Sequence, residues 1–271
     1  MTFDEEYFNI GYLDRLSFQD TFVHRLDPIT KLLATVAFII TVVSFPKYEI
    51  KGLLPFFLFP VLLLTIGDIP LKFILKKILT VSPFAVFIGI LNPVFDSETR
   101  YVLWGVGISG GWISFLSIMI KFVLTIGAAL LLIATSSFPG VCRALQRLGL
   151  PDIFISQLMF LYRYLFVLME ETMKIVRARD MRSFGNKGTG SRTFIGIVGV
   201  LLIRTIERAE RIYNAMLSRG FTGKIITSRK VKFGFQDMAF LAIALAAALG
   251  FRYYDITGLI GNLFIDIAGK I

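Results

Sequence analysis

Residues Trp112–Ala134 read WISFLSIMIKFVLTIGAALLLIA, and this run contains one charged residue, Lys121. An apolar stretch of about 20 residues is long enough to cross the hydrocarbon core of a bilayer as an α-helix. A helix also satisfies its backbone hydrogen bonds internally, which lipid cannot do for it. The stretch therefore predicts a membrane-spanning helix, and with it an α-helical membrane protein.

The composition of the 271-residue chain agrees with this prediction, because 55% of the residues are hydrophobic and 27 are phenylalanine. A soluble domain of this length carries more charge. Residues 1–30 are polar and acidic, without the apolar core of a cleavable signal peptide, so we expect the first apolar run to stay in the mature protein. Since Cys142 and His24 are each the only residue of their kind, we expect no intrachain disulfide, no metal site and no cofactor.

Outward from the first stretch, four more apolar runs predict spans at about residues 30–45, 53–66, 73–95 and 238–251. Asp27 before Pro28 is a typical N-cap followed by proline at the first helical position. Pro83 inside the third run predicts a kink. Residues 96–111 predict a polar, glycine-containing loop. The predicted fold is an all-α polytopic membrane protein with about five transmembrane helices.

The positive charge is concentrated in one segment. Residues 139–236 hold 17 Lys and Arg against 6 Asp and Glu, whereas the net charge of the whole chain is +10. Such a segment can face anionic lipid, an acidic protein or nucleic acid, and its apolar interruptions favour lipid and protein over nucleic acid. We therefore expect four parts, at residues 1–29, 30–138, 139–236 and 237–271.

Two long helices are predicted inside the basic segment, at residues 152–182 and 193–219. Their lengths are about 45 Å and about 40 Å at 1.5 Å per residue. Each has an apolar first half and a charged second half, a pattern typical of helices at the membrane boundary. By length alone, residues 153–169 could instead cross the membrane, although they contain Arg163.

The distribution of Lys and Arg among the loops predicts the orientation. The loop between the second and third spans has Lys72, Lys76 and Lys77, whereas the loop after the third span has only Arg100. We expect the N-terminus and the basic segment in the cytoplasm, and the protein in the plasma membrane of a prokaryote.

The basic segment contains one pattern twice, at an offset of 37 residues. The matching pairs are Glu170 and Glu207, Ala178 and Ala215, Arg182 and Arg219, Ser183 and Gly220, and Phe184 and Phe221. Lys174 and Arg211 match in charge. Each copy predicts a helix that ends at an arginine, followed by a small residue and a phenylalanine.

An arginine in the last turn of a helix often satisfies only the free carbonyls and the helix dipole, with Gly220 as the C′ residue. That explanation does not require an alanine four residues before the arginine and a phenylalanine two residues after it, twice. Alanine at this spacing allows another backbone to approach, and arginine offers five donors to carboxylates or carbonyls. The repeat therefore predicts two helix tips that meet a two-fold partner.

These residues resemble the transmembrane T components of energy-coupling factor importers, the EcfT/CbiQ family. Ser218-Arg219-Gly220 matches the second of two Xaa-Arg-Gly signatures in that family. Met181-Arg182-Ser183 is similar to the first, with Ser183 in place of glycine. The stretch from Val23 to Pro28, followed by Lys31, is similar to the start of the first span in CbiQ-type members, and residues 139–150 resemble the stretch before the coupling helices.

The resemblance implies a non-catalytic scaffold. It implies that the arginine-tipped helices dock on two ATP-binding-cassette ATPase subunits, with Ala178, Ala215, Ser183, Gly220, Phe184 and Phe221 beside Arg182 and Arg219. It also implies a substrate-capture membrane subunit, of S or CbiM-like type, and uptake of cobalt or nickel. We expect this chain not to bind ATP itself, because no P-loop is present in the sequence.

Lys121 remains open between two roles, because a charge inside a span faces either the bundle or a partner such as the capture subunit. Two alternatives to the scaffold also remain. A standalone secondary transporter or channel would favour inverted repeats and several ionisable residues at mid-membrane. A membrane-embedded enzyme would need clustered acidic or histidine residues, and the sequence contains no convincing catalytic group.

Overall fold

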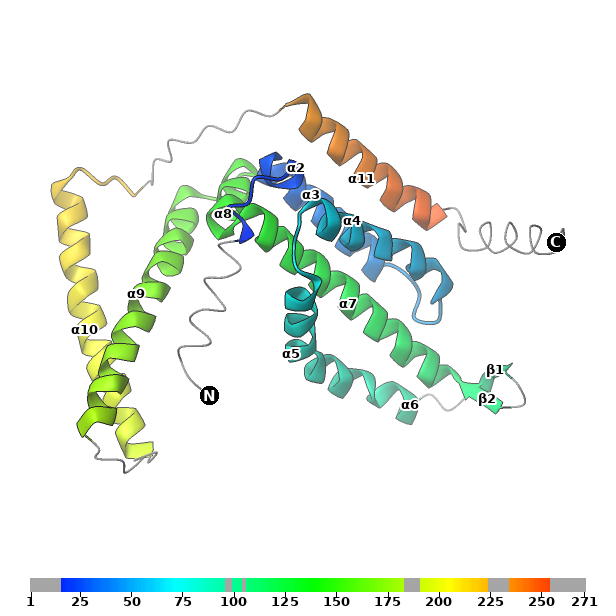
Figure 1. Cartoon of the computed structure of the whole chain (residues 1–271), viewed down its shortest axis with the longest axis horizontal. Helices are drawn as coiled ribbons and strands as arrows, with labels where there is room; N and C mark the ends of the chain where they lie inside the picture. The colour runs from blue at the N-terminus through cyan, green and yellow to red at the C-terminus, as the bar shows by residue number, and fades with distance from the viewer. Residues whose placement is uncertain (1–15, 96–98, 104–105, 183–190, 224–233, 254–271) are drawn as a thin grey trace. The chain divides into compact units, whose positions relative to one another are not determined.

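The computed structural model describes residues 16–95, 99–103, 106–182, 191–223 and 234–253 (Figure 1). The chain divides into two compact units. Within the described ranges, the larger unit contains residues 16–137 and 234–253, and the smaller unit contains residues 138–182 and 191–223. We describe each unit separately.

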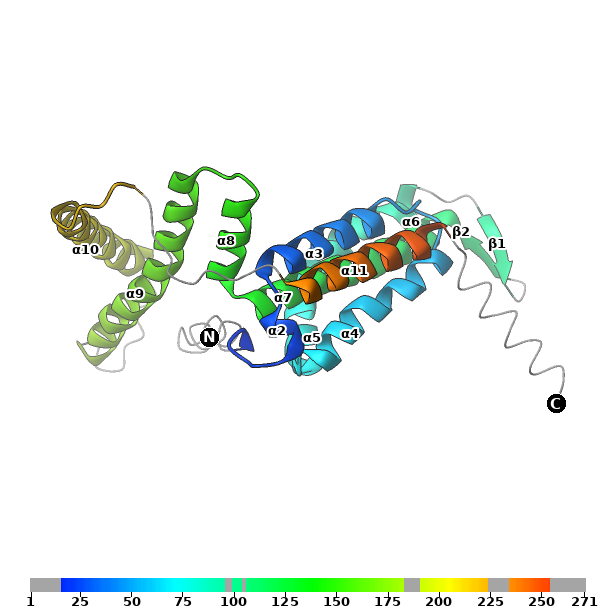
Figure 2. The ribbon, with the colours of Figure 1, turned by 90° about the horizontal axis from the view of Figure 1, so that it is seen from above.

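The larger unit is a helical bundle around α7. Its elements are α2 (Phe22–Arg25), α3 (Pro28–Val43), the 3-10 helix η1 (Lys51–Phe57), α4 (Leu58–Ile66), α5 (Leu71–Gly89), α6 (Leu91–Phe95), β1 (Thr99–Leu103), β2 (Val106–Ser109), α7 (Gly110–Ser136) and α11 (Phe235–Tyr253). Helix α7 packs against α3, α4, α5 and α6. Helix α11 lies beside α3, although it comes last in the described chain (Figure 2).

All five predicted spans are helical in the structure, which confirms the all-α class. The second span begins with the 3-10 helix η1, which contains Pro55. Helix α5 contains Pro83, and it changes direction along its length in Figure 1, as a proline inside a helix predicts. One detail was not expected: β1 and β2 form a short antiparallel hairpin in the loop before α7.

The helices are suited to lipid. Four of them in the described ranges are long and apolar enough to cross a membrane: Leu71–Pro93, Gly110–Ser136, Asp152–Arg182 and Phe235–Tyr253. Large apolar side chains on α5 and α11, such as Leu79 and Ile243, are about 70% exposed to the surroundings of the chain. Because water would penalise so much apolar surface, the larger unit is a membrane unit.

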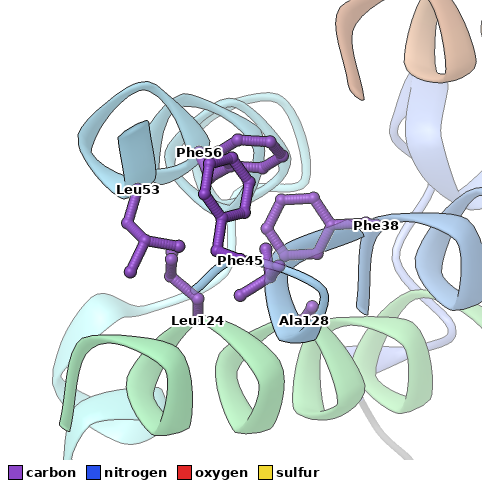
Figure 3. Packing of buried hydrophobic residues seen from close by; sticks show 7 residues of the cluster. Phe38, Phe45, Leu53, Phe56, Leu124 and Ala128 are labelled. Atoms are coloured by element: carbon purple, nitrogen blue, oxygen red, sulfur yellow. The ribbon is translucent and has the colours of Figure 1, made fainter. Parts of the chain in front are cut away.

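Three phenylalanines pack with aliphatic residues in the hydrophobic core cluster of this unit (Figure 3). Phe56 is 1% exposed, and its ring lies 5.8 Å from Phe38, 5.3 Å from Phe45 and 5.7 Å from Phe251, centroid to centroid. Leu124 of α7 packs against the same cluster. The cluster joins η1, α3, α7 and α11, so it fixes the relative positions of four segments.

Side-chain contacts hold the chain at both ends of α3. At its start, the side chain of Asp27 accepts a hydrogen bond from the backbone N–H of Ile29, as predicted for an N-cap. Two residues after its end, the carbonyl of Phe45 accepts a hydrogen bond from the Lys121 ammonium at 2.6 Å. Arg252 lies over the Phe45 ring, 4.4 Å from its centroid. Charged side chains from α7 and α11 thus hold the residues that directly follow α3.

The smaller unit contains α8 (Phe138–Arg147), α9 (Asp152–Arg182) and α10 (Ser191–Ser218). Helix α9 has the predicted limits, and α10 lies within two residues of the predicted start and one of the predicted end. Helix α8 packs on the first part of α9, where the rings of Phe138 and Tyr162 stack at 4.7 Å. The burial of Cys142 in α8 raises the pKa of its thiol, which therefore stays protonated at neutral pH.

Candidate functional site

Helices α9 and α10 run antiparallel. Near the middle of both helices, the Arg204 guanidinium donates to the Glu171 carboxylate at 2.6 Å. Nearer the start of α9, the ring of Phe160 lies 5.9 Å from that of Phe221, which follows α10. The Ser156 hydroxyl, further toward that start, donates to the carbonyl of Gly223 at 3.0 Å. Residues earlier in α9 therefore meet residues later in the α10 segment.

This arrangement places the two repeated arginines at opposite ends of the helix pair. Arg182 is the last residue of α9, whereas Arg219 directly follows α10, close to the start of α9. Arg182 lies 22 residues beyond Phe160, which is about 33 Å along the helix at 1.5 Å per residue. The sequence repeat thus produces two separate tips rather than one joint site.

The Arg219 tip has a defined backbone geometry. Gly220 has φ +79°, in the left-handed region. Its N–H donates to the carbonyl of Leu217 at 2.9 Å, and the N–H of Phe221 donates to that of Met216 at 3.0 Å. This pair of bonds is the Schellman motif, with Gly220 at C′ as the sequence predicts. The motif satisfies the last carbonyls of α10, so Arg219 does not need to cap them and its side chain is exposed.

The Arg182 tip is described up to the arginine itself, which is exposed. Ser183 and Phe184 lie outside the described residues, so the backbone geometry that follows Arg182 stays a prediction. Ala178 is half-buried near the end of α9, and Ala215 is exposed near the end of α10. Each alanine lies one turn before its arginine.

An apolar groove of about 670 Å³ runs between α9 and α10. Its lining includes Phe160, Tyr164, Ile212, Met216 and Phe221. The groove ends at the loop after Arg219, so apolar surface and a charged tip adjoin each other there. Anchors of this composition are typical of protein interfaces, where aromatic, methionine and arginine side chains are enriched.

Carboxylates of α9 and α10 form ion pairs on the helix surfaces. A carboxylate oxygen of Glu207 lies 3.9 Å from the Arg211 guanidinium at i, i+4 spacing, and Glu171 pairs with Arg204. Such exposed pairs contribute about 0–1 kcal/mol each. Within the described ranges, no group of three or more His, Cys, Asp and Glu side chains is placed to hold a metal ion.

Lys121 belongs to the other unit, on α7, and is not part of this site. Its hydrogen bond to Phe45 supports the structural one of its two expected roles. Phe160 and Ser156, which hold the loop after Arg219, were not found from the sequence. Their apolar and polar periodicity along α9 does not indicate which segment they contact.

Comparisons with known proteins identify similar sequences. The model of the CbiQ family, described as cobalt transport protein, matches residues 19–231. An energy-coupling factor transporter transmembrane protein EcfT of Ruminiclostridium cellulolyticum is 28% identical over 220 residues, 75% of this chain and 81% of the relative. The EcfT protein of Streptococcus thermophilus is 29% identical, over 75% of this chain and 82% of the relative. That of Bacillus subtilis is 27% identical, over 74% and 81%.

Proposed function

The chain belongs to the cobalt transport protein family CbiQ, and from this membership we propose that it is the transmembrane scaffold of an ATP-driven importer of the energy-coupling factor type. In this proposal the chain itself catalyses nothing. The smaller unit couples two ATPase subunits to the membrane unit, and a separate membrane subunit captures the substrate.

The observation that carries the proposal is the pair of exposed arginines, Arg182 and Arg219, at the two opposite ends of the antiparallel helix pair α9–α10. Arg182 lies about 33 Å along α9 from Phe160, which contacts the residues after Arg219, and two such separate tips suit two separate partner subunits better than one. Arginine stays charged at every accessible pH and offers a planar set of donors for carboxylates or carbonyls of a partner. Ala178 and Ala215 permit close approach at each tip, and the phenylalanines of the repeat supply apolar contact.

Continuous helices explain how such a scaffold transmits motion. Helix α9 runs for 31 residues without interruption, so a displacement at Arg182 tilts the helix as a whole. Its first part is held by α8 through the stacked rings of Phe138 and Tyr162. A partner that moves the tip therefore moves the base of α9 as well.

The orientation and the cargo belong to the same proposal. The start of α3, the end of α7 and the start of α11 lie at one end of the membrane unit, and hydrogen bonds join them there. Within the described residues, the chain leaves the membrane unit after α7 and re-enters it before α11, both at this end, which supports a common cytoplasmic side. We assign anionic lipid as the partner of the basic surface of the smaller unit.

The family description supports cobalt, or the similar ion nickel, as the substrate, with the capture subunit as its binding protein.

Charge reversal at both tips tests the scaffold. Arg182→Glu combined with Arg219→Glu should abolish co-purification of the ATPase subunits and substrate uptake, while the chain still inserts into the membrane. The matched control is Lys174→Glu combined with Arg211→Glu, since these residues occupy equivalent positions of the repeat and the change in net charge is the same. Normal uptake in the tip variant would refute the proposal.

Reconstitution of the purified chain alone distinguishes the scaffold from a standalone transporter or channel. The scaffold should transport nothing in liposomes until the ATPase and capture subunits are added with ATP. Transport of cobalt or nickel by the chain alone would favour the alternative. Identification of the co-purified capture subunit would determine the substrate class.

A further inference from the structure

Three helix ends of the membrane unit meet at a cluster of buried charged side chains. Asp27, Lys31 and Asp237 are 2%, 4% and 6% exposed. Asp27 is the N-cap of α3, Lys31 lies in the first turn of α3, and Asp237 lies in the first turn of α11. We call these three residues the buried charge cluster.

Asp237 joins α11 to α3. One of its carboxylate oxygens accepts the backbone N–H of Asp27 at 2.7 Å, and the other accepts that of Gly234 at 2.8 Å. The bond to Gly234 is the one that an N3 carboxylate makes in a capping box. A single side chain thus caps its own helix and fixes the start of a second helix to it.

Lys31 joins α3 to α7. Its ammonium donates to the carbonyl of Thr135 at 2.7 Å, in the last turn of α7. The carboxylates of Asp27 and Asp237 attract this ammonium electrostatically. A cation is favourable at the carbonyl end of a helix, so Lys31 stabilises the end of α7.

The cluster lies where the chain leaves the membrane unit. Thr135 is two residues before Ser137, after which the smaller unit begins. Ser137 has φ +57°, an uncommon conformation for a residue other than glycine. The second connection returns to the membrane unit immediately before α11. Within the described residues, both connections between the two units therefore reach the membrane unit next to a residue bound by Lys31 or Asp237.

Stability alone does not explain such a cluster. Burying charges costs free energy that their attraction only partly returns, and apolar residues of similar volume often replace buried ion pairs without loss. Their position suggests a mechanical reason instead. If the last turn of α7 or the first turn of α11 unwound when the smaller unit moves, the motion would distort these turns only. It would not reach the rest of the membrane unit.

We propose that Lys31 and Asp237 are positioning residues that fix the end of α7 and the start of α11 to α3, so that motion of the smaller unit reaches the membrane bundle. This inference rests on the proposed function, because it assumes that partner ATPases move the smaller unit. It gives the sequence from His24 to Lys31 a role of its own, separate from the arginine tips.

The test compares two lysines that make the same type of bond. Lys31→Met and Lys121→Met each remove one ammonium that donates to a backbone carbonyl, that of Thr135 at 2.7 Å and that of Phe45 at 2.6 Å. Of these two lysines, only Lys31 binds a helix end from which the chain continues into the smaller unit. Each variant is assembled into the full transporter complex in liposomes, and uptake of the metal ion is measured per ATP hydrolysed.

We expect Lys31→Met to lower this ratio at least about fivefold, the lower bound of typical coupling between sites, with assembly and ATP hydrolysis retained. Lys31→Arg, which keeps a donor cation, should restore most of the ratio. Lys121→Met should lower thermal stability but leave the ratio near that of the wild type. An unchanged ratio in Lys31→Met, or an equal loss in both methionine variants, would overturn the inference.

Asp237→Asn provides a second, milder variant, since the asparagine keeps one acceptor oxygen and loses the charge. If Lys31→Met fails to assemble, a lowered ratio in Asp237→Asn supports the inference and an unchanged one refutes it. Failure of the proposed function looks different, because the wild-type chain would then bind no ATPase. Normal assembly with normal coupling in the variants contradicts the positioning role alone.

Discussion

The ring of Phe160 lies 5.9 Å from that of Phe221, centroid to centroid, with the two planes at 62°. The contact joins the early part of α9 to the second residue after Arg219. Together with the bond from Ser156 to Gly223, it holds the loop that follows α10 against α9. The position of the Arg219 tip therefore depends on residues far from it in the sequence.

Loss of this ring contact should loosen the Arg219 tip. Phe160→Leu keeps an apolar side chain but removes an aromatic pair worth about 0.5–1.5 kcal/mol. We expect weaker ATPase binding than in the wild type, with a smaller loss than Arg219→Glu causes. Phe154→Leu is the control, because Phe154 is 62% exposed on the same helix. Equal binding by the two phenylalanine variants would contradict this role of Phe160.

Gly220→Ala should destabilise the end of α10 by about 1–2 kcal/mol, because a Cβ disfavours the left-handed conformation. No atom lies within 4 Å of the Cβ position, so the cost is conformational rather than steric. Gly196→Ala, inside α10 and equally unobstructed, should stabilise the helix by about 0.5–1 kcal/mol. Thermal unfolding in detergent, with hydrogen exchange at residues 214–221, checks both signs.

Phe56→Ala should be the most damaging of these changes to the membrane unit. Its side chain contacts the rings of Phe38, Phe45 and Phe251, and truncation leaves a cavity at the junction of four segments. Core Phe→Ala changes cost about 3–5 kcal/mol. Phe87→Ala should cost much less stability, because the Phe87 side chain on α5 is 71% exposed. Similar unfolding midpoints for the two variants would show that the cluster does not hold the bundle together.

Acid should weaken the start of the bundle through His24. Burial, and then the charge of Lys31, lower the pKa of this imidazole, whose Nδ1 lies 2.7 Å from the Thr21 hydroxyl. The fold therefore favours the neutral ring. Its contribution to stability is complete above the unfolded pKa of about 6.5 and is lost as the pH falls toward the lower folded pKa.

The measurement is the melting temperature at pH 7.5 and at pH 5.0 for the wild type and for His24→Gln. Glutamine cannot be protonated in this range, so the wild type should lose more stability on acidification than the variant. A parallel loss in both proteins would assign the acid sensitivity to other groups.

Local patterns in the sequence predict most of the helices and one of the two tips. The spans follow from the length of apolar runs, and the Schellman motif at Gly220 involves bonds within five residues. Contacts over long distances along the chain could not be predicted. Lys31 and Thr135 are 104 residues apart, and nothing near either residue indicates the other. The same holds for Phe160 and Phe221, so the opposite placement of the tips emerged only from the structure.

The bond between the Asp27 amide and the Asp237 carboxylate joins residues 210 positions apart. A chain is synthesised from its N-terminus at about 5–20 residues per second, so α3 precedes its acceptor by roughly 10–40 s. During that interval the carboxylate that accepts the Asp27 N–H has not yet been made, whereas Thr135, the acceptor for Lys31, follows after 104 residues. Insertion of α11 therefore completes the hydrogen bonding at the start of α3. A truncated chain that ends before Asp237 lacks this bond.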